Sequence, residues 1–177
     1  MSYNEYQALD GNNVFVSENE KLDEIINNCN ENSVIVLTDS NYETNLNVSV
    51  KGTKITSENN SVIKGDIVVS ANDVTFENVS IESETPLIFN SNETMENVNI
   101  KNVKLNNDIK INADVEKFTI ENVISDKGIE FNGNSQNVLI QNNELNEAIS
   151  FNSSIGETSI FNNKINNDTG FVINGNV

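Results

Sequence analysis

Ile109-Lys-Ile-Asn112 returns as Ile129-Glu-Phe-Asn132 and again as Ile149-Ser-Phe-Asn152, with a step of 20 residues each time. A second phrase keeps the same step, as Phe118-Thr-Ile-Glu-Asn122, Val138-Leu-Ile-Gln-Asn142 and Thr158-Ser-Ile-Phe-Asn162. A fixed period of this length is typical of solenoid proteins, in which each repeat forms one turn. The apolar residues stand two apart, which is the period of a β-strand and not of a helix.

The pattern continues on both sides of this stretch, with slightly longer steps upstream. A third short phrase follows the second in each turn, for example Val103-Lys-Leu105 and Asn163-Lys-Ile165. Three strand phrases per turn, each ending in a polar corner, predict an all-β, right-handed, three-sided parallel β-helix with about 20–22 residues per coil. Stacking then places one apolar residue of each turn in a common interior column: Ile67, Leu87, Ile109, Ile129, Ile149 and Phe171.

Asparagine closes the phrases and therefore recurs at fixed places in successive turns. One row follows the second phrase: Asn78, Asn102, Asn122, Asn142 and Asn162. Another row follows the first phrase: Asn90, Asn112, Asn132, Asn152 and Asn174. Asparagine amides can hydrogen-bond from coil to coil, and asparagine tolerates the left-handed backbone that a sharp corner needs. We predict structural asparagine ladders along both rows.

Charged residues at outward positions fall in register between neighbouring turns. Lys110 lies beside Glu130, Glu144 beside Lys164, and Lys101 between Glu77 and Glu121 in this alignment. Such lateral pairs contribute roughly 0.2–1 kcal/mol each. They also support the alignment, because a slip of one residue would turn the charges inward.

The chain before the regular coils is expected to form an N-terminal segment, residues 1–45, with coils over residues 46–177. Ser17 and Glu20 form a capping-box pattern, and Leu22, Ile26 and Cys29 share one helical face. We expect a helix over about 17–30 that covers the N-terminal end of the core, followed by a first buried strand at 34–37 and a turn at Asn41-Tyr42. Six or seven coils fit between Leu46 and Val177.

Composition limits the function. The net charge is −17, with no His and no Arg among 177 residues, which argues against nucleic acid as a ligand because phosphate binding relies on clustered Lys and Arg. No run reaches transmembrane length, and the N-terminus lacks the basic and apolar regions of a signal peptide. We expect no membrane insertion. The chain is cytoplasmic if it is complete, and extracellular or on the cell surface if it is a trimmed fragment.

The stretch from the helix to the first coils resembles the entry of right-handed β-helix proteins of the pectate-lyase-like superfamily. The phrases that carry the resemblance are Val48-Ser-Val-Lys-Gly52, Ser61-Val-Ile-Lys-Gly65 and Asn72-Asp-Val-Thr-Phe-Glu-Asn78. The asparagine-rich repeats of surface, adhesin-like proteins are similar to the later coils. The resemblance implies the fold. It says little about activity, because these phrases are architectural.

Enzymes of that superfamily that act on acidic polysaccharides use an Arg base with Ca²⁺-binding carboxylates, or Asp residues with a His. This chain has neither Arg nor His, and the sequence suggests no catalytic residues, no metal ligands and no cofactor. Loop carboxylates at Asp73, Glu93 and Asp114 could in principle hold Ca²⁺, but their spacing does not repeat and a solvated acidic stripe is favoured. Cys29 is expected to be a core residue, since no His is available to activate it.

Two features remain for binding. Leu139 and Phe161 point outward, with Ile124 on the next face, although isolated exposed apolar residues are common. Phe171 and Ile173 belong to a last coil that lacks a cap, which suggests self-association through the C-terminal end. We therefore expect a non-enzymatic binding or structural module of a surface adhesin or phage fibre type, with a protein or glycan partner. The alternatives are a polysaccharide lyase or hydrolase, and an acidic decoy for a nucleic-acid-binding protein.

Overall fold

The chain forms a parallel β-solenoid in a computed structural model that describes residues 12–177. Every strand pairing in this range is parallel. Each turn contributes one strand to each of up to three columns, so neighbouring turns cover the apolar row that one turn alone would expose. Of the predicted N-terminal segment, residues 1–11 lie outside the described residues.

Three columns of strands run along the axis. The first column holds β1 (Asn13–Val16), β2 (Val34–Leu37), β5 (Lys54–Ser57), β8 (Thr75–Glu82), β10 (Met95–Leu105), β12 (Val115–Glu121), β15 (Ser135–Gln141) and β18 (Thr158–Phe161). The second holds β3 (Asn41–Glu43), β6 (Val62–Lys64), the ends of β8 and β10, β13 (Ile124–Ser125), β16 (Glu144–Leu145) and β19 (Lys164–Ile165). The third holds β4 (Leu46–Val48), β7 (Ile67–Val69), β9 (Leu87–Asn90), β11 (Ile109–Asn112), β14 (Ile129–Phe131), β17 (Ile149–Phe151) and β20 (Phe171–Ile173).

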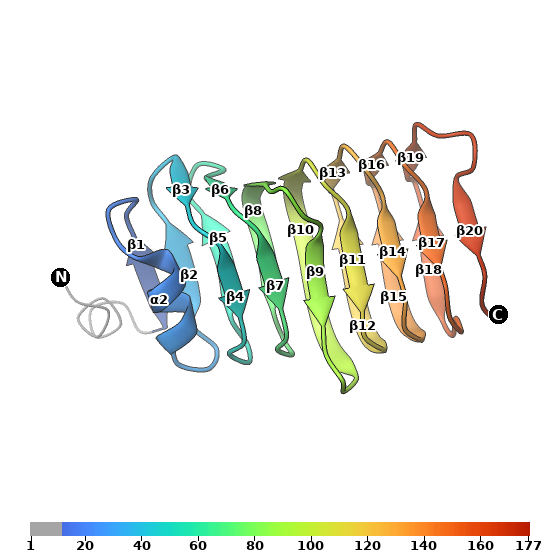
Figure 1. The fold of residues 1–177 in the computed structure, drawn as a ribbon, viewed down its shortest axis with the longest axis horizontal. Helices are drawn as coiled ribbons and strands as arrows, with labels where there is room; N and C mark the ends of the chain where they lie inside the picture. Colours follow the sequence, from blue (N-terminus) through green and yellow to red (C-terminus); the bar gives the residue numbers. More distant parts are fainter. Residues whose placement is uncertain (1–11) are drawn as a thin grey trace.

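The solenoid has about eight turns, because the first column contains 8 strands. The third column contains 7 strands from Leu46 onward, as the sequence predicts, and β1 adds one further level before them. In Figure 1 the third-column strands lie in front and run downward while the chain advances from the N-terminal to the C-terminal end, which makes the turn right-handed. The predicted β-helix fold is confirmed.

Strand register confirms the predicted interior column. Leu87 pairs with Ile109, Ile109 with Ile129, and Ile129 with Ile149. The sequence reasoning missed a stack of five phenylalanines along the axis, which joins the first and third columns: Phe76, Phe89, Phe118, Phe131 and Phe151. All five are almost fully buried. Edge-to-face and stacked ring pairs of this kind add to the hydrophobic stabilisation of the core.

The N-terminal helix α2 (Leu22–Asn28) is shorter than the predicted span of about 17–30. The Ser17–Glu20 pair forms, with the Ser17 N–H donating to Glu20 Oε2 at 2.9 Å, but it closes a turn ahead of the helix, whose N-cap is Lys21. Leu22 and Ile26 form the buried face. The helix packs against β4 and covers the third column at the level of the first turn (Figure 1).

Tyr42 lies in strand β3, so the turn expected at Asn41-Tyr42 is wrong. The side chain is buried, and its hydroxyl donates to the Val16 carbonyl of the preceding turn. The same hydroxyl accepts hydrogen bonds from the backbone N–H groups of Thr38 and Asp39, both at 2.9 Å. Burial raises the pKa of this phenol. Tyr42 therefore joins the first two turns rather than ending a strand.

Two of the predicted charge pairs form and one group pairs differently. Lys110 lies 3.9 Å from Glu130, and Lys164 lies 3.3 Å from Glu144. Lys101 is in register between Glu77 and Glu121 as expected, but Glu77 makes its ion pair with Lys54, at 2.6 Å. The register is as predicted, but Glu77 pairs with a lysine of the preceding turn and not with Lys101 of the following turn.

Ser135 interrupts an apolar interior column and gives a first prediction. It stands in register between Val115 and Ile155, it is 3% exposed, and its hydroxyl has no hydrogen-bond partner among residues 12–177. Replacing Ser135 by valine should raise the free energy of unfolding by about 1 kcal/mol, because it removes an unsatisfied hydroxyl and adds apolar contacts. Urea unfolding followed by circular dichroism measures the change. Ser150→Val, at an outward position, is the control and should change stability by less than about 0.5 kcal/mol. An unchanged or lower midpoint for Ser135→Val would contradict the prediction.

Candidate functional site

The first asparagine row forms the corner between the first and second columns. All five residues have left-handed backbone, with φ between 53° and 57°: Asn78, Asn102, Asn122, Asn142 and Asn162. Asparagine is among the few side-chain-bearing residues that adopt this region readily. The Asn102 amide donates to Asn78 Oδ1 at 3.1 Å. The main role of this row is therefore to turn the backbone.

The second asparagine row forms the longer amide ladder. Asn132 donates to Asn112, Asn152 to Asn132, and Asn174 to Asn152, each at 2.8 Å between Nδ2 and Oδ1. Every one of these bonds points back toward the N-terminal end. The ladder confirms the prediction for these residues, and Asn90 is in register at its start, beside Asn112.

A hydrogen-bonded pair, the buried Asn143 and the half-buried Asn163, was missed by sequence reasoning. Asn143 is 3% exposed. Its Oδ1 accepts from the Val123 N–H at 2.8 Å, and its Nδ2 donates to the Ile120 carbonyl at 3.0 Å and to Asn163 Oδ1 at 2.9 Å. Asn163 likewise donates to the Ile140 carbonyl, at 2.9 Å. The doublets Asn142-Asn143 and Asn162-Asn163 were the available signal.

A second corner lies within the first column, where the sequence predicts only flexible acidic loops. Four residues there also have left-handed backbone: Asp73, Asn97, Lys117 and Asn137. Asp73 accepts from the Asn97 amide at 3.1 Å and lies 3.8 Å from the Lys51 ammonium. Asp114, another of the loop carboxylates, accepts the Asn134 N–H at 2.8 Å. Among residues 12–177, no three His, Cys, Asp or Glu side chains are grouped so that they could hold a metal ion.

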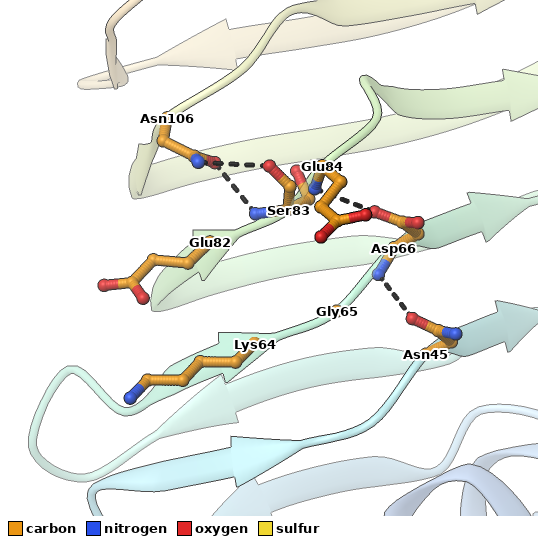
Figure 2. A pocket seen from close by; sticks show the side chains of 8 residues that line it. All are labelled: Asn45, Lys64, Gly65, Asp66, Glu82, Ser83, Glu84 and Asn106. Carbon is orange, nitrogen blue, oxygen red and sulfur yellow. Dashed lines mark hydrogen bonds between the residues drawn. The ribbon is translucent and has the colours of Figure 1, made fainter.

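A hollow of about 510 Å³ lies at the corner between the second and third columns (Figure 2). It extends over four successive turns, which contribute Asn45, then Lys64 to Asp66, then Glu82 to Glu84, then Asn106. The turns approach closely here: a Cβ added at Gly65 would lie 2.0 Å from the Thr44 carbonyl oxygen. The hollow is open and polar, and three carboxylates line it.

The polar groups of this hollow bind the backbone of neighbouring turns. Asn45 Oδ1 accepts from the Asp66 N–H at 2.8 Å, and Asp66 Oδ1 accepts from the N–H groups of Glu84 and Thr85 at 3.0 and 3.1 Å. Asn106 accepts from the Ser83 N–H at 2.9 Å and donates to its carbonyl. In Figure 2, Lys64 and Glu82 extend away from Asp66 on neighbouring strands. The Asp66 carboxylate thus accepts the hydrogen bonds that hold neighbouring turns together at this corner.

The predicted interaction residues Ile124, Leu139 and Phe161 lie on two neighbouring columns. Ile124 is 48% exposed on the second column, and Phe161 is 46% exposed at the end of the first. Leu139 is half-buried and is in register with Ser159, not with Phe161. Phe161 is in register with Gln141, two residues beyond Leu139, on the neighbouring strand β18.

The C-terminal layer exposes interior side chains. Phe171 and Ile173 pair with Ile149 and Phe151 on one side only, and they are 47% and 54% exposed. Ile160 and Ile165, also at interior positions, are partly buried. Within the described part of the chain, β18, β19 and β20 each end their column without a further strand. This layer, residues 158–173, is called the open end below.

Cys29 lies in the core, as its place on the helix pattern predicts. Its thiol donates to the Ile26 carbonyl and contacts the Thr53 hydroxyl. Burial raises the pKa of this thiol, which reduces its thiolate fraction at neutral pH and hence its nucleophilicity. The described helix α2 has neither the length nor the apolar character to cross a membrane.

Comparisons of the chain with protein-family models, with curated proteins and with solved structures found no match. The sequence and the geometry together show a parallel β-solenoid of about eight turns with asparagine side-chain ladders.

Proposed function

We propose that the chain is a non-enzymatic β-solenoid module, a rigid binding or structural element of the kind found in surface adhesins and phage fibres. The observation that carries the proposal is the use of the polar corner groups. Asn45, Asp66 and Asn106, which line the hollow of Figure 2, all hydrogen-bond to the backbone of an adjacent turn. Side chains that hold turns together in this way favour a rigid rod, about 4.8 Å longer for each turn.

The relation to the pectate-lyase-like superfamily and to adhesin-like repeats belongs to this proposal. The phrases around Val48, Ser61 and Val74 fit a β-helix entry, and they lie in strands or directly before them. A surface protein would present its ligand site on an outward row, where exposed residues such as Ile124 and Phe161 stand among polar neighbours. The partner chemistry that fits is a protein or a glycan.

The rival function is polysaccharide cleavage at the hollow, since Asp66, Glu82 and Glu84 supply carboxylates there. Glycosidases need two carboxyl groups about 5–10 Å apart across a cleft. The test is incubation with pectin, alginate and neutral glycans, with reducing ends and unsaturated uronate absorbance as the readouts. We expect no turnover above that of the Glu82→Gln/Glu84→Gln double variant. Turnover by the wild-type chain that the double variant loses would overturn the proposal.

The net charge of −17 favours a second alternative, an acidic decoy for a nucleic-acid-binding protein. Affinity capture with the immobilised chain distinguishes the two. A binding module should retain its partner at 0.5 M salt, because contacts to apolar and uncharged polar groups are weakly screened. Basic partners that all dissociate on adding salt would instead support the decoy.

A further inference from the structure

An asparagine–glycine step, Asn132–Gly133, follows strand β14 directly. Glycine has no side chain to shield its backbone nitrogen, so this nitrogen can attack the side-chain carbonyl carbon of the preceding asparagine. Both residues are half-buried, so water reaches them. The step therefore has the composition and the solvent access that spontaneous deamidation requires.

The fold requires glycine at position 133. A Cβ added there would lie 2.1 Å from the Ala113 carbonyl oxygen and 2.5 Å from the Asp114 backbone nitrogen. Both atoms belong to the backbone of the preceding turn, so no side-chain rotation relieves contacts that short. After the ladder asparagines of the neighbouring turns the chain has Ala113 and Ser153 instead. Close packing of the turns thus places glycine directly after a ladder asparagine at this one level.

The asparagine ladder holds the Asn132 amide on both sides. Its Nδ2 donates to Asn112 Oδ1, and its Oδ1 accepts from Asn152 Nδ2, each at 2.8 Å. Attack by the Gly133 nitrogen on Asn132 Cγ needs rotation about the Cα–Cβ and Cα–C bonds of Asn132. That rotation moves the amide out of the ladder and breaks both hydrogen bonds.

The backbone on either side of Gly133 is fixed to the preceding turn. The Asn132 N–H donates to the Ile111 carbonyl, and the Asn134 N–H donates to Asp114 Oδ1, both at 2.8 Å. The chain can therefore reach the cyclic geometry only after a local opening of this corner. A reaction that passes through such an opening has a rate set by the population of the open form.

From these contacts we infer that Asn132 is a deamidation site that the asparagine ladder holds unreactive in the folded chain. In the reaction, the Gly133 backbone nitrogen bonds to Asn132 Cγ, and its proton leaves with the side-chain nitrogen as ammonia. Water then opens the cyclic imide at one of its two carbonyl carbons, which gives aspartate or isoaspartate. One water is consumed and one ammonia released, without an oxidant or a reductant. The inference does not depend on the proposed function.

The product of this reaction does not fit the ladder. A carboxylate at position 132 has no N–H to donate to Asn112 Oδ1, so two acceptors face each other in place of a 2.8 Å hydrogen bond. Glu130 lies beside the same ladder, where its Oε1 accepts from Asn152 Nδ2 at 3.2 Å, and the new negative charge adds to that of Glu130. The isoaspartate form also lengthens the main chain by one carbon atom. Deamidation at this residue therefore loosens one layer of the rod.

Peptide mapping by mass spectrometry during incubation in mildly alkaline buffer tests the inference. The method separates Asn132 from the other Asn–Gly step, Asn174–Gly175. In the folded wild-type chain, Asn132 should deamidate at least about tenfold more slowly than in the same chain unfolded in guanidinium chloride. Asn112→Ala removes the acceptor of the Asn132 amide. It should raise the folded-state rate about fivefold, the increase in open population expected from the loss of one hydrogen bond.

Asn152→Ala is a second variant that frees the Asn132 amide from the other side. Asn152 is exposed, so the fold tolerates the change and water replaces the lost donor; the rate at Asn132 should again rise. Asn146→Ala is the matched control, because it removes the acceptor of a separate exposed amide bond, from Asn166 Nδ2 at 3.2 Å. This control should leave the rate at Asn132 within about twofold of the wild type.

Three results would overturn the inference. The first is an unfolded chain in which Asn132 does not deamidate, and the second is a folded wild-type chain in which Asn132 reacts as fast as in the unfolded chain. The third is a wild-type rate in the ladder variants that circular dichroism shows to be folded. If Asn112→Ala does not fold, Asn152→Ala and the comparison of folded with unfolded wild-type chain decide the matter.

Discussion

Replacing Phe118 by alanine is expected to lower the free energy of unfolding by about 4 kcal/mol, the typical loss for a buried phenylalanine. Phe118 is 0% exposed and lies at the centre of the phenylalanine stack. Its ring is edge-to-face with Phe89 at 5.2 Å and with Phe131 at 5.8 Å between centroids. The substitution removes both ring contacts and leaves a cavity between two β-columns, which cannot move together without breaking the register.

Urea unfolding followed by circular dichroism measures this loss. Phe161→Ala is the matched control, because Phe161 is 46% exposed and should contribute less than about 1 kcal/mol. Solenoid stability is a sum over turns and their interfaces, so Phe118→Ala could also split the unfolding curve into two transitions. A loss no larger than that of Phe161→Ala would show that the stack does not stabilise the core.

Asn143→Val should cost about 3 kcal/mol, although the preceding turn carries valine at the same place, Val123. The substitution adds apolar surface at a buried site, and composition alone would suggest a gain. Asn143, however, bonds the Val123 N–H and the Ile120 carbonyl. A buried backbone group left without a partner costs about 1–3 kcal/mol, and the Val123 N–H loses its amide acceptor in this variant.

The control for Asn143→Val is Asn166→Ala, which removes an exposed amide bond to Asn146 of 3.2 Å. Water replaces that bond, so we expect a loss below about 1 kcal/mol. Differential scanning calorimetry of both variants beside the wild type gives the comparison. Equal melting temperatures for Asn143→Val and the wild type would mean that the buried amide is dispensable.

The features of the fold that could be predicted from the sequence are those that follow from the 20-residue repeat. The 20-residue step gave the parallel columns, the interior row from Ile67 to Ile149 and the corner asparagines, because each depends only on which residues stack. The same alignment placed Lys110 beside Glu130 correctly. Strand register depends only on the spacing of residues along the chain, so a single sequence is enough to predict it.

The parts that sequence reasoning missed depend on contacts across the turn or on side-chain rotamers. The phenylalanine stack joins Phe89 of one column to Phe118 of another, and alignment within a column says nothing about that. Lys54 rather than Lys101 reaches Glu77, since the direction of a long side chain is not set by register. The hollow around Asp66 arises from a local approach of turns at the corner. The helix began at Leu22 because the Ser17–Glu20 contact closed a separate turn.

The constant step of the later turns has a consequence for how such a rod changes in size. Ile109, Ile129 and Ile149 are stacked 20 residues apart, and the segments between them have the same strand order. A duplication or deletion of one 20-residue unit therefore restores the same neighbours on both sides of the junction. A gene can thus lengthen or shorten the rod in whole layers, about 4.8 Å at a time, while the helix-covered end and the open end keep their surfaces.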